Sequence, residues 1–225
     1  MISDNIKKHK ENCGQEVKLV AVSKTKPEED LIEAYNVGQR DFGENKVQDL
    51  TRKYENLPKD INWHFIGHLQ TNKTKYIAPF VHLIHAVDSL KLLKAINKEA
   101  LKNNRVINVL LQIYIATETT KFGLSPQEVT EILAGSEIKA LKNIKIAGLM
   151  GMATNSNNQD IVRNEFRTLK TLFESVKTEF FINDESFMHL SMGMSHDYKL
   201  AIEEGSNMVR IGSSIFGARD YPNKH

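Results

Sequence analysis

The sequence predicts a single α/β domain folded as a (β/α)8 barrel. Eight short apolar runs recur along the chain, and most are continuous, as in parallel strands covered on both faces. Segments with helical spacing separate these runs, and strict alternation of strand and helix defines the α/β class. Eight units favour closure into a barrel over an open doubly wound sheet. No linker or low-complexity tract divides the chain, so we expect one domain over residues 1–225.

The elements follow from the apolar runs and from the helix signals between them. An extra helix precedes the first strand. Ser125-Pro126, with Glu128 three residues after the serine, is typical of a helix start with a capping box. Residues 160–178 carry an apolar stripe at helical spacing. The predicted strands are residues 18–24, 41–44, 62–67, 82–88, 107–115, 144–152, 187–192 and 208–212.

Composition and charge limit the class of protein. Hydrophobic residues make up 40% of the 225 residues and charged residues 26%, a balance that supports a packed core. The net charge of +2 is too small to indicate nucleic acid or an anionic membrane as the main partner. The single cysteine, Cys13, excludes an internal disulfide framework and a cysteine metal cluster. Residues 1–14 lack the apolar segment of a secretory signal, so we expect a cytoplasmic protein.

The barrel fold predicts where the reacting groups should lie. In such barrels the active site forms at the carboxyl ends of the strands. The residues that the sequence places there are Lys24, Glu44, Asn45, His68, Asp88, Thr117, Met152, Ala153, Ser191, Met192, Gly193, Gly212, Ser213 and Ser214.

Lys24 is the first candidate, because it directly follows the apolar strand that ends in Ser23. Most lysines extend their ammonium group into solvent, and this explanation remains open. Alternatively, Lys24 points into the barrel mouth, where desolvation lowers its pKa and provides free amine. A free amine attacks a carbonyl carbon to form a Schiff base. Lys26 lies next to Pro27 in the turn and is better explained as a solvated residue.

Two loops rich in glycine and serine follow the seventh and eighth strands, at residues 190–197 and 209–217. Loops at these two positions frequently bind phosphate in such barrels. Glycine allows backbone N–H groups to approach an anion, and serine hydroxyls donate hydrogen bonds. Ordinary turn chemistry also explains each loop taken alone. The residues that could contribute are Ser191, Gly193, Ser195, Gly212, Ser213 and Ser214.

Arg210 lies inside the last strand, between Val209 and Ile211. A guanidinium at such a position stays charged and needs a partner, either a buried carboxylate or a ligand. A Schiff-base lysine, a phosphate site and a buried arginine together describe a site for pyridoxal 5′-phosphate (PLP), with Arg210 at the ring nitrogen. A sugar-phosphate aldolase would use the lysine and the phosphate site without needing the arginine.

The histidines do not form a predicted metal site. His64 and His68 are four residues apart, which on a strand separates them by ~13 Å, too far to share one ion. His82 and His85 should point to opposite faces of their strand. We therefore expect core or rim histidines and no bound metal.

Five sequence blocks resemble signatures of the pyridoxal phosphate homeostasis proteins, a YggS-like family: AVSKTKP, GQRDFGENKVQ, WHFIGHLQTNK, LSMGMSHD and SNMVRIGSSIFGARDY. The resemblance, over residues 18–221, implies a single barrel like the N-terminal domain of alanine racemases, of fold type III. It implies that Lys24 carries PLP as a covalent imine, that Arg210 faces the ring nitrogen and that Asn45 lies near the cofactor. Gly151 departs from the threonine or cysteine common in relatives, and none of these roles depends on it. The implied phosphate contacts are Ser191, Ser195, Gly212 and Ser213.

The leading functional hypothesis is a monomeric PLP carrier without a catalytic residue. Alanine racemases need a second base, a tyrosine from a partner's extra domain, and we expect no such domain here. The arginine also leaves the ring nitrogen unprotonated, which weakens the cofactor as an electron sink. We therefore expect PLP storage, buffering or delivery within the cell, with apo PLP-dependent enzymes as recipients. The alternative is a weakly active PLP-dependent amino-acid racemase or related enzyme of fold type III.

Overall fold

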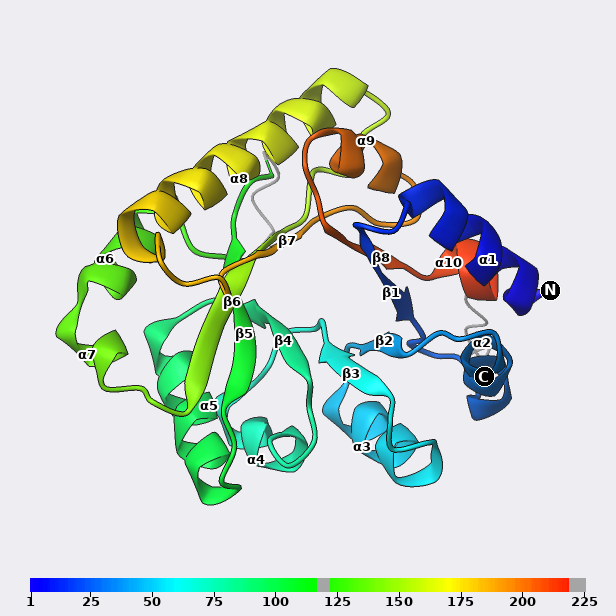
Figure 1. The fold of residues 1–225 in the computed structure, drawn as a ribbon, viewed down its shortest axis with the longest axis horizontal. Helices are drawn as coiled ribbons and strands as arrows, with labels where there is room; N and C mark the ends of the chain where they lie inside the picture. The colour runs from blue at the N-terminus through cyan, green and yellow to red at the C-terminus, as the bar shows by residue number, and fades with distance from the viewer. Residues whose placement is uncertain (117–121, 219–225) are drawn as a thin grey trace, which may run out of the picture.

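The computed structural model describes residues 1–116 and 122–218, and its strands form a closed parallel barrel in the order β1 to β8 (Figure 1). Sequential strands are neighbours, and β8 pairs with β1 to complete the ring. The predicted barrel is therefore confirmed. Thr117, which the sequence places after the fifth strand, lies outside the described residues. The strands are β1 (Lys18–Val22), β2 (Asp41–Glu44), β3 (Asn62–Phe65), β4 (Leu83–Val87), β5 (Ile107–Ile113), β6 (Ile144–Gly151), β7 (His189–Ser191) and β8 (Met208–Ile211).

Helices lie outside the ring of strands and connect them (Figure 1). The predicted capping box is present, because the Ser125 hydroxyl accepts from the Glu128 N–H at 3.2 Å and a Glu128 carboxylate oxygen accepts from the Ser125 N–H at 2.8 Å. No helix in the described parts of the chain is long and apolar enough to cross a membrane. The helices are α1 (Ile2–Cys13), α2 (Glu28–Asn36), α3 (Val47–Asn56), the 3-10 turn η1 (Thr71–Lys73), α4 (Thr74–Ile77), α5 (Leu90–Lys102), α6 (Pro126–Ala134), α7 (Ser136–Lys139), α8 (Gln159–Phe180), α9 (Tyr198–Glu203) and α10 (Ser213–Phe216).

All eight predicted strands exist, and the structure shortens most of them at their carboxyl ends. The first ends at Val22 rather than at Lys24. Ser23 still donates its N–H to the Gly43 carbonyl at 3.0 Å, and the chain then turns through Thr25, whose φ is +66°. A positive φ is uncommon for a residue with a branched side chain and breaks the strand. Lys24 therefore lies in the turn that follows β1.

The core has two layers, one inside the barrel and one between the strands and the helices. The outer layer is continuous around the ring and includes Trp63 and Phe166. A smaller apolar cluster, which includes Val20 and Met208, fills part of the barrel interior. Burial on both faces explains why the strand sequences are continuous apolar runs rather than alternating ones.

The predicted additional helix is α1, which packs against α2 and α10 outside the barrel (Figure 1). Ile6 is completely buried in this contact, and Cys13 ends the helix as a buried free thiol. Burial raises the pKa of the Cys13 thiol to about 11, so it remains protonated at neutral pH. A protonated, buried thiol is a poor nucleophile, so Cys13 serves as a packing residue of α1.

Candidate functional site

The turn that carries Lys24 is held by a buried polar cluster at the carboxyl ends of β1 and β2. The Ser23 hydroxyl donates to a Glu44 carboxylate oxygen at 2.6 Å. Lys53, on α3, donates to the same oxygen at 2.7 Å and to the Ser23 carbonyl at 2.8 Å. All three side chains are buried, so this cluster fixes the backbone next to half-buried Lys24. Sequence reasoning did not identify Lys53, because an isolated lysine on an amphipathic helix is usually exposed.

Glu44 is the residue of this cluster whose charged form is destabilised by burial. Desolvation raises the pKa of its carboxyl group, and the neighbouring Lys53 ammonium offsets only part of this effect. Its second oxygen, Oε2, is buried and has no hydrogen-bond partner among residues 1–116 and 122–218. An unsatisfied buried oxygen costs ~1–3 kcal/mol, so the cluster contributes rigidity more than stability.

Arg210 is buried near the carboxyl end of β8, and its hydrogen-bond partners among the described residues are a hydroxyl and two carbonyls. Its Nη1 donates to the carbonyl and hydroxyl of Ser191 at 2.9 and 2.6 Å, and its Nη2 donates to the Gly151 carbonyl at 3.0 Å. Within the described residues, these bonds leave the Nε–H group for a ligand. Burial lowers the pKa of Arg210 to about 10, partly opposed by the Asp197 charge, so the guanidinium remains charged at pH 7.

The two glycine- and serine-rich loops after β7 and β8 meet each other. The Ser195 hydroxyl, from the first loop, accepts from the Gly212 N–H at 3.1 Å. Gly193 has a φ of +96°, and a Cβ atom at this position would approach the Ala201 Cβ to 2.7 Å, so only glycine fits. Ser213 is exposed at the start of the single-turn helix α10. The loops thus bring Ser195, Gly212 and Ser213 together, as the sequence predicts.

Ser191 has a different environment from the other predicted phosphate contacts. It is the last residue of β7 and is completely buried, with its hydroxyl between Arg210 and the His85 Nδ1, which is 3.2 Å away. Asn45 follows β2 and is half-buried. Gly67 packs so closely on Asn45 that a Cβ atom would approach the Asn45 carbonyl oxygen to 2.3 Å.

The other residues that the sequence places at this end of the barrel follow β1, β3, β4 and β6. Lys26 donates to the Ala218 carbonyl at 2.8 Å. His68 and Asp88, which follow β3 and β4, form an ion pair at 3.4 Å if the histidine is protonated. Met152 and Ala153 follow β6, and Ala153 is buried.

A hydrogen-bonded chain runs through the barrel interior from Arg210 to the opposite rim, and sequence reasoning missed it. His85 Nε2 and His64 Nδ1 are 2.9 Å apart, and His64 Nε2 is 2.9 Å from an Asp41 carboxylate oxygen. Because Arg210 only donates and a carboxylate only accepts, the bonds run from Arg210 through Ser191, His85 and His64 to Asp41. Desolvation lowers the pKa of both histidines, so each is neutral at pH 7.

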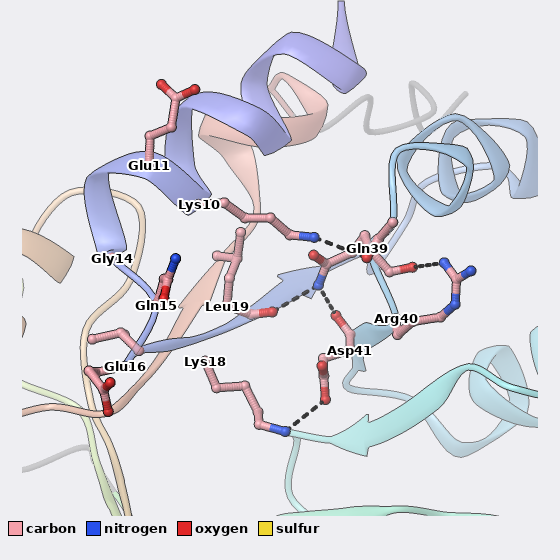
Figure 2. A pocket seen from close by; sticks show the side chains of 12 residues that line it. Lys10, Glu11, Gly14, Gln15, Glu16, Lys18, Leu19, Gln39, Arg40 and Asp41 are labelled. Carbon is pink, nitrogen blue, oxygen red and sulfur yellow. Dashed lines mark hydrogen bonds and ion pairs between the residues drawn. The ribbon is translucent and has the colours of Figure 1, made fainter.

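A groove of about 820 Å³ lies at the other end of the barrel, where β1 and β2 begin (Figure 2). We call it the amino-terminal groove. The Gln39 amide forms its floor by donating to the carbonyls of Leu19 and Asp41 at 2.8 and 2.6 Å. The Lys18 ammonium lies 3.5 Å from the Asp41 carboxylate (Figure 2). The groove is lined by Lys10, Glu11, Gly14, Gln15, Glu16, Val17, Lys18, Leu19, Gly38, Gln39, Arg40 and Asp41.

The fold and the site at the carboxyl ends of the strands define the class of protein. The family model described as the N-terminal domain of alanine racemase matches residues 1–220, and this chain belongs to that class of barrel. More narrowly, the chain belongs to the family of pyridoxal phosphate homeostasis proteins. Relatives with that name from Aquifex aeolicus and Schizosaccharomyces pombe are 44% and 43% identical. The matches cover 94% and 92% of this chain, and 90% and 86% of the relatives.

Solved structures agree with this assignment. PipY of Synechococcus elongatus, determined with PLP bound, is 30% identical and superposes with a TM-score of 0.86 over 96% of this chain and 100% of PipY. Alanine racemase from Corynebacterium glutamicum is only 16% identical, with a TM-score of 0.70 over 97% of this chain and 60% of the racemase. The second comparison establishes the barrel fold alone.

Proposed function

We propose that this protein binds PLP covalently through Lys24 and holds it for storage, buffering or delivery. The observation that carries the proposal is the meeting of three chemical groups at one end of the barrel. Lys24 follows β1, while Arg210 and the joined loops belong to β7 and β8. Because β8 pairs with β1, these groups come from three consecutive strands of the barrel, β7, β8 and β1.

The donor set fits the cofactor. The Lys24 amine would attack the aldehyde carbon, and loss of one water molecule would leave a C=N bond. Serine hydroxyls of Ser195 and Ser213, with the N–H groups of the first turn of α10, supply donors suited to a phosphate. The Nε–H group of Arg210 would face the ring nitrogen. PLP bound in this way supplies an electron sink for carbanions.

The surroundings of the site favour holding the cofactor over transforming amino acids. Arg210 remains charged at pH 7 and does not readily give a proton to the ring, which limits the electron sink. A racemase also needs a second base opposite the lysine. Two tyrosines are engaged elsewhere: the Tyr198 hydroxyl accepts from Asn12 at 3.4 Å, and the Tyr35 hydroxyl donates to Asp60 at 2.8 Å.

The test is a PLP titration of the purified protein followed by imine absorbance. We expect wild type and Lys26→Ala to develop the imine band and Lys24→Ala to lose it. Incubation with a panel of amino acids then separates a carrier from an enzyme. Release of PLP to an apo PLP-dependent enzyme supports the carrier function. Robust racemisation or decarboxylation that disappears in Lys24→Ala would contradict it and support a weakly active enzyme.

A further inference from the structure

The rim of the barrel opposite Lys24 gathers three side chains with metal-ligating atoms. One ligand atom from each of Asp41, His64 and His82 lies within 4.8 Å of the other two. Imidazole nitrogens with one carboxylate oxygen are a donor set typical of Zn²⁺ and related divalent metals. We propose that Asp41, His64 and His82 bind a divalent transition metal of the zinc class, with Asp41 at the edge of the amino-terminal groove.

Two of these ligands lie on the neighbouring parallel strands β2 and β3, and the third directly precedes β4. Asp41 is the first residue of β2, and its register partner on β3 is Asn62, two residues before His64. His82 directly precedes β4 and donates its N–H to the Trp63 carbonyl at 2.9 Å. The ligand positions therefore depend on backbone hydrogen bonds of the barrel rather than on a loop. Sites on rigid elements hold ligand geometry better than sites on loops.

One of the two oxygens of the Asp41 carboxylate is available as a metal ligand. Within the described part of the chain, His64, Asn62 and Lys18 all contact Oδ1, at 2.9, 3.4 and 3.5 Å. This arrangement leaves Oδ2 for a metal. Burial alone would raise the pKa of Asp41, but the hydrogen bond from His64 and the positive charge of Lys18 act in the opposite direction, and the pKa is lowered. The carboxylate is thus ionised at pH 7, as a ligand must be.

The two imidazoles are also in the ligand form. Desolvation lowers the pKa of His64, and it is also the main cause that lowers the pKa of His82 to about 4. A neutral imidazole has a lone pair for the metal. When a metal replaces the proton on His64 Nε2, that proton moves to Nδ1 and donates to His85 Nε2, 2.9 Å away. The proton of His85 then moves from Nε2 to Nδ1, where it donates to the Ser191 hydroxyl oxygen at 3.2 Å. His85 would then orient the ligand from the outer sphere, as is usual for metal-bound histidines.

Asp41 connects the proposed site to the amino-terminal groove, because it is both a ligand and a lining residue of that groove. Three protein ligands with an open fourth position is a common arrangement for zinc. Asp41 borders the groove of about 820 Å³, which provides the entry path (Figure 2). The Lys18 ammonium opposes a cation here and must move away from Asp41 (Figure 2). Its side chain is 36% exposed, so it can extend into solvent instead.

The test titrates the full-length protein, with any affinity tag removed, with Zn²⁺ in competition with a chromophoric chelator. We expect one high-affinity equivalent per chain. His82→Gln and Asp41→Asn should each lower the affinity by more than the ~10- to 100-fold that loss of an outer-sphere partner costs. His68→Gln is the matched control, because His68 is a largely exposed histidine at the opposite end of the barrel. Its affinity should equal that of wild type.

Circular dichroism and metal-free thermal midpoints check that each variant is folded. If a variant unfolds, the visible absorption of Co²⁺ on the wild-type protein decides the question. We expect intense bands of a four- or five-coordinate nitrogen and oxygen site, which excess Zn²⁺ removes. The proposal is overturned if the chelator strips all Zn²⁺, if His82→Gln and His68→Gln bind equally, or if Co²⁺ shows only the spectrum of the hydrated ion. None of these readouts involves PLP.

Discussion

The Arg210 guanidinium on β8 donates to both the hydroxyl and the carbonyl of Ser191 on β7, at 2.6 and 2.9 Å. This contact connects the end of the barrel that carries Lys24 with the interior. The Ser191 hydroxyl donates to His85, His85 donates to His64, and His64 donates to Asp41 at the opposite rim. Arg210 is thus oriented by residues that a ligand need not touch.

Arg210→Ala should leave the imine with Lys24 intact and weaken retention of PLP, because the ring loses its facing donor. We expect ~10-fold weaker affinity or more, since a hydrogen bond to a charged group is worth ~1.5–3 kcal/mol. Arg105→Ala is the matched control, because Arg105 also donates to two backbone carbonyls, those of Ala78 and Val81, at 2.6 and 2.8 Å. A cofactor titration in which Arg210→Ala and Arg105→Ala retain equal affinity would contradict the proposed contact.

Lys53→Met should destabilise the protein by ~3–5 kcal/mol, because it leaves the Glu44 carboxylate buried without its cation. Urea unfolding at pH 7 measures the loss. The double variant with Glu44→Gln should recover part of it, since the buried charge is then gone. Arg52→Met, on the exposed face of the same helix, should change the unfolding free energy by less than ~1 kcal/mol. If Lys53→Met changes the unfolding free energy only slightly, the Lys53–Glu44 ion pair does not hold the turn that carries Lys24.

The buried histidines make stability depend on pH. Desolvation and the charges of His64 and Arg210 hold the pKa of His85 well below 6.5 in the native protein. The unfolded chain takes up a proton near pH 6.5 whereas native His85 does not, so the free energy of unfolding falls as pH decreases below 6.5. Between pH 7 and pH 5, His85 should account for about 2 kcal/mol of this loss. His85→Gln should show a correspondingly smaller decline in urea unfolding, and an unchanged decline would refute this origin.

Gly148 on β6 is the glycine whose replacement should damage the barrel most clearly. It has a φ of +150°, and a Cβ atom would lie 1.8 Å from the His189 carbonyl oxygen on β7. A backbone atom cannot move aside as a flexible side chain can. Gly148→Ala should therefore lower the free energy of unfolding by more than ~4 kcal/mol or prevent folding. Gly14→Ala is the control, because Gly14 also has a positive φ, +74°, but no atom lies within 4 Å of the added Cβ. We expect Gly14→Ala to lower the free energy of unfolding by ~1 kcal/mol. Equal losses for Gly14→Ala and Gly148→Ala in urea unfolding would contradict the predicted clash with the His189 carbonyl.

The strands could be predicted because the barrel buries both faces of each one, and the apolar runs record that burial directly. That the loops after β7 and β8 lie at the same end of the barrel could be predicted, because both follow the carboxyl ends of adjacent parallel strands. The contact between Ser195 and Gly212 agrees with that prediction. The alternative of a buried carboxylate for Arg210 did not hold among the described residues. Its partners are a hydroxyl and two carbonyls, which no spacing in the sequence reveals.

The interior histidine chain could not be predicted, because it depends on register between strands. His64 lies on β3 and is completely buried, whereas His68 follows the strand and is largely exposed. The relevant neighbours of His64 lie on other strands, namely Asp41 on β2 and His85 on β4. A one-residue shift of register would move His85 to the other face. The prediction that His82 and His85 point to opposite faces of one strand is wrong, because the rings of both lie against His64, with centroids 5.4 and 5.1 Å away. His82 precedes β4, so the alternation of a strand does not apply to it.

The measurement that tests the central claim most directly is borohydride reduction of the PLP-loaded protein, followed by peptide mass spectrometry. Reduction converts the C=N bond into a stable amine, so the mass of the cofactor stays on the lysine that held it. We expect the pyridoxyl group on Lys24, in the peptide that follows β1, and none in Lys24→Ala. An adduct on Lys26 or on any other lysine would contradict the assignment of the site.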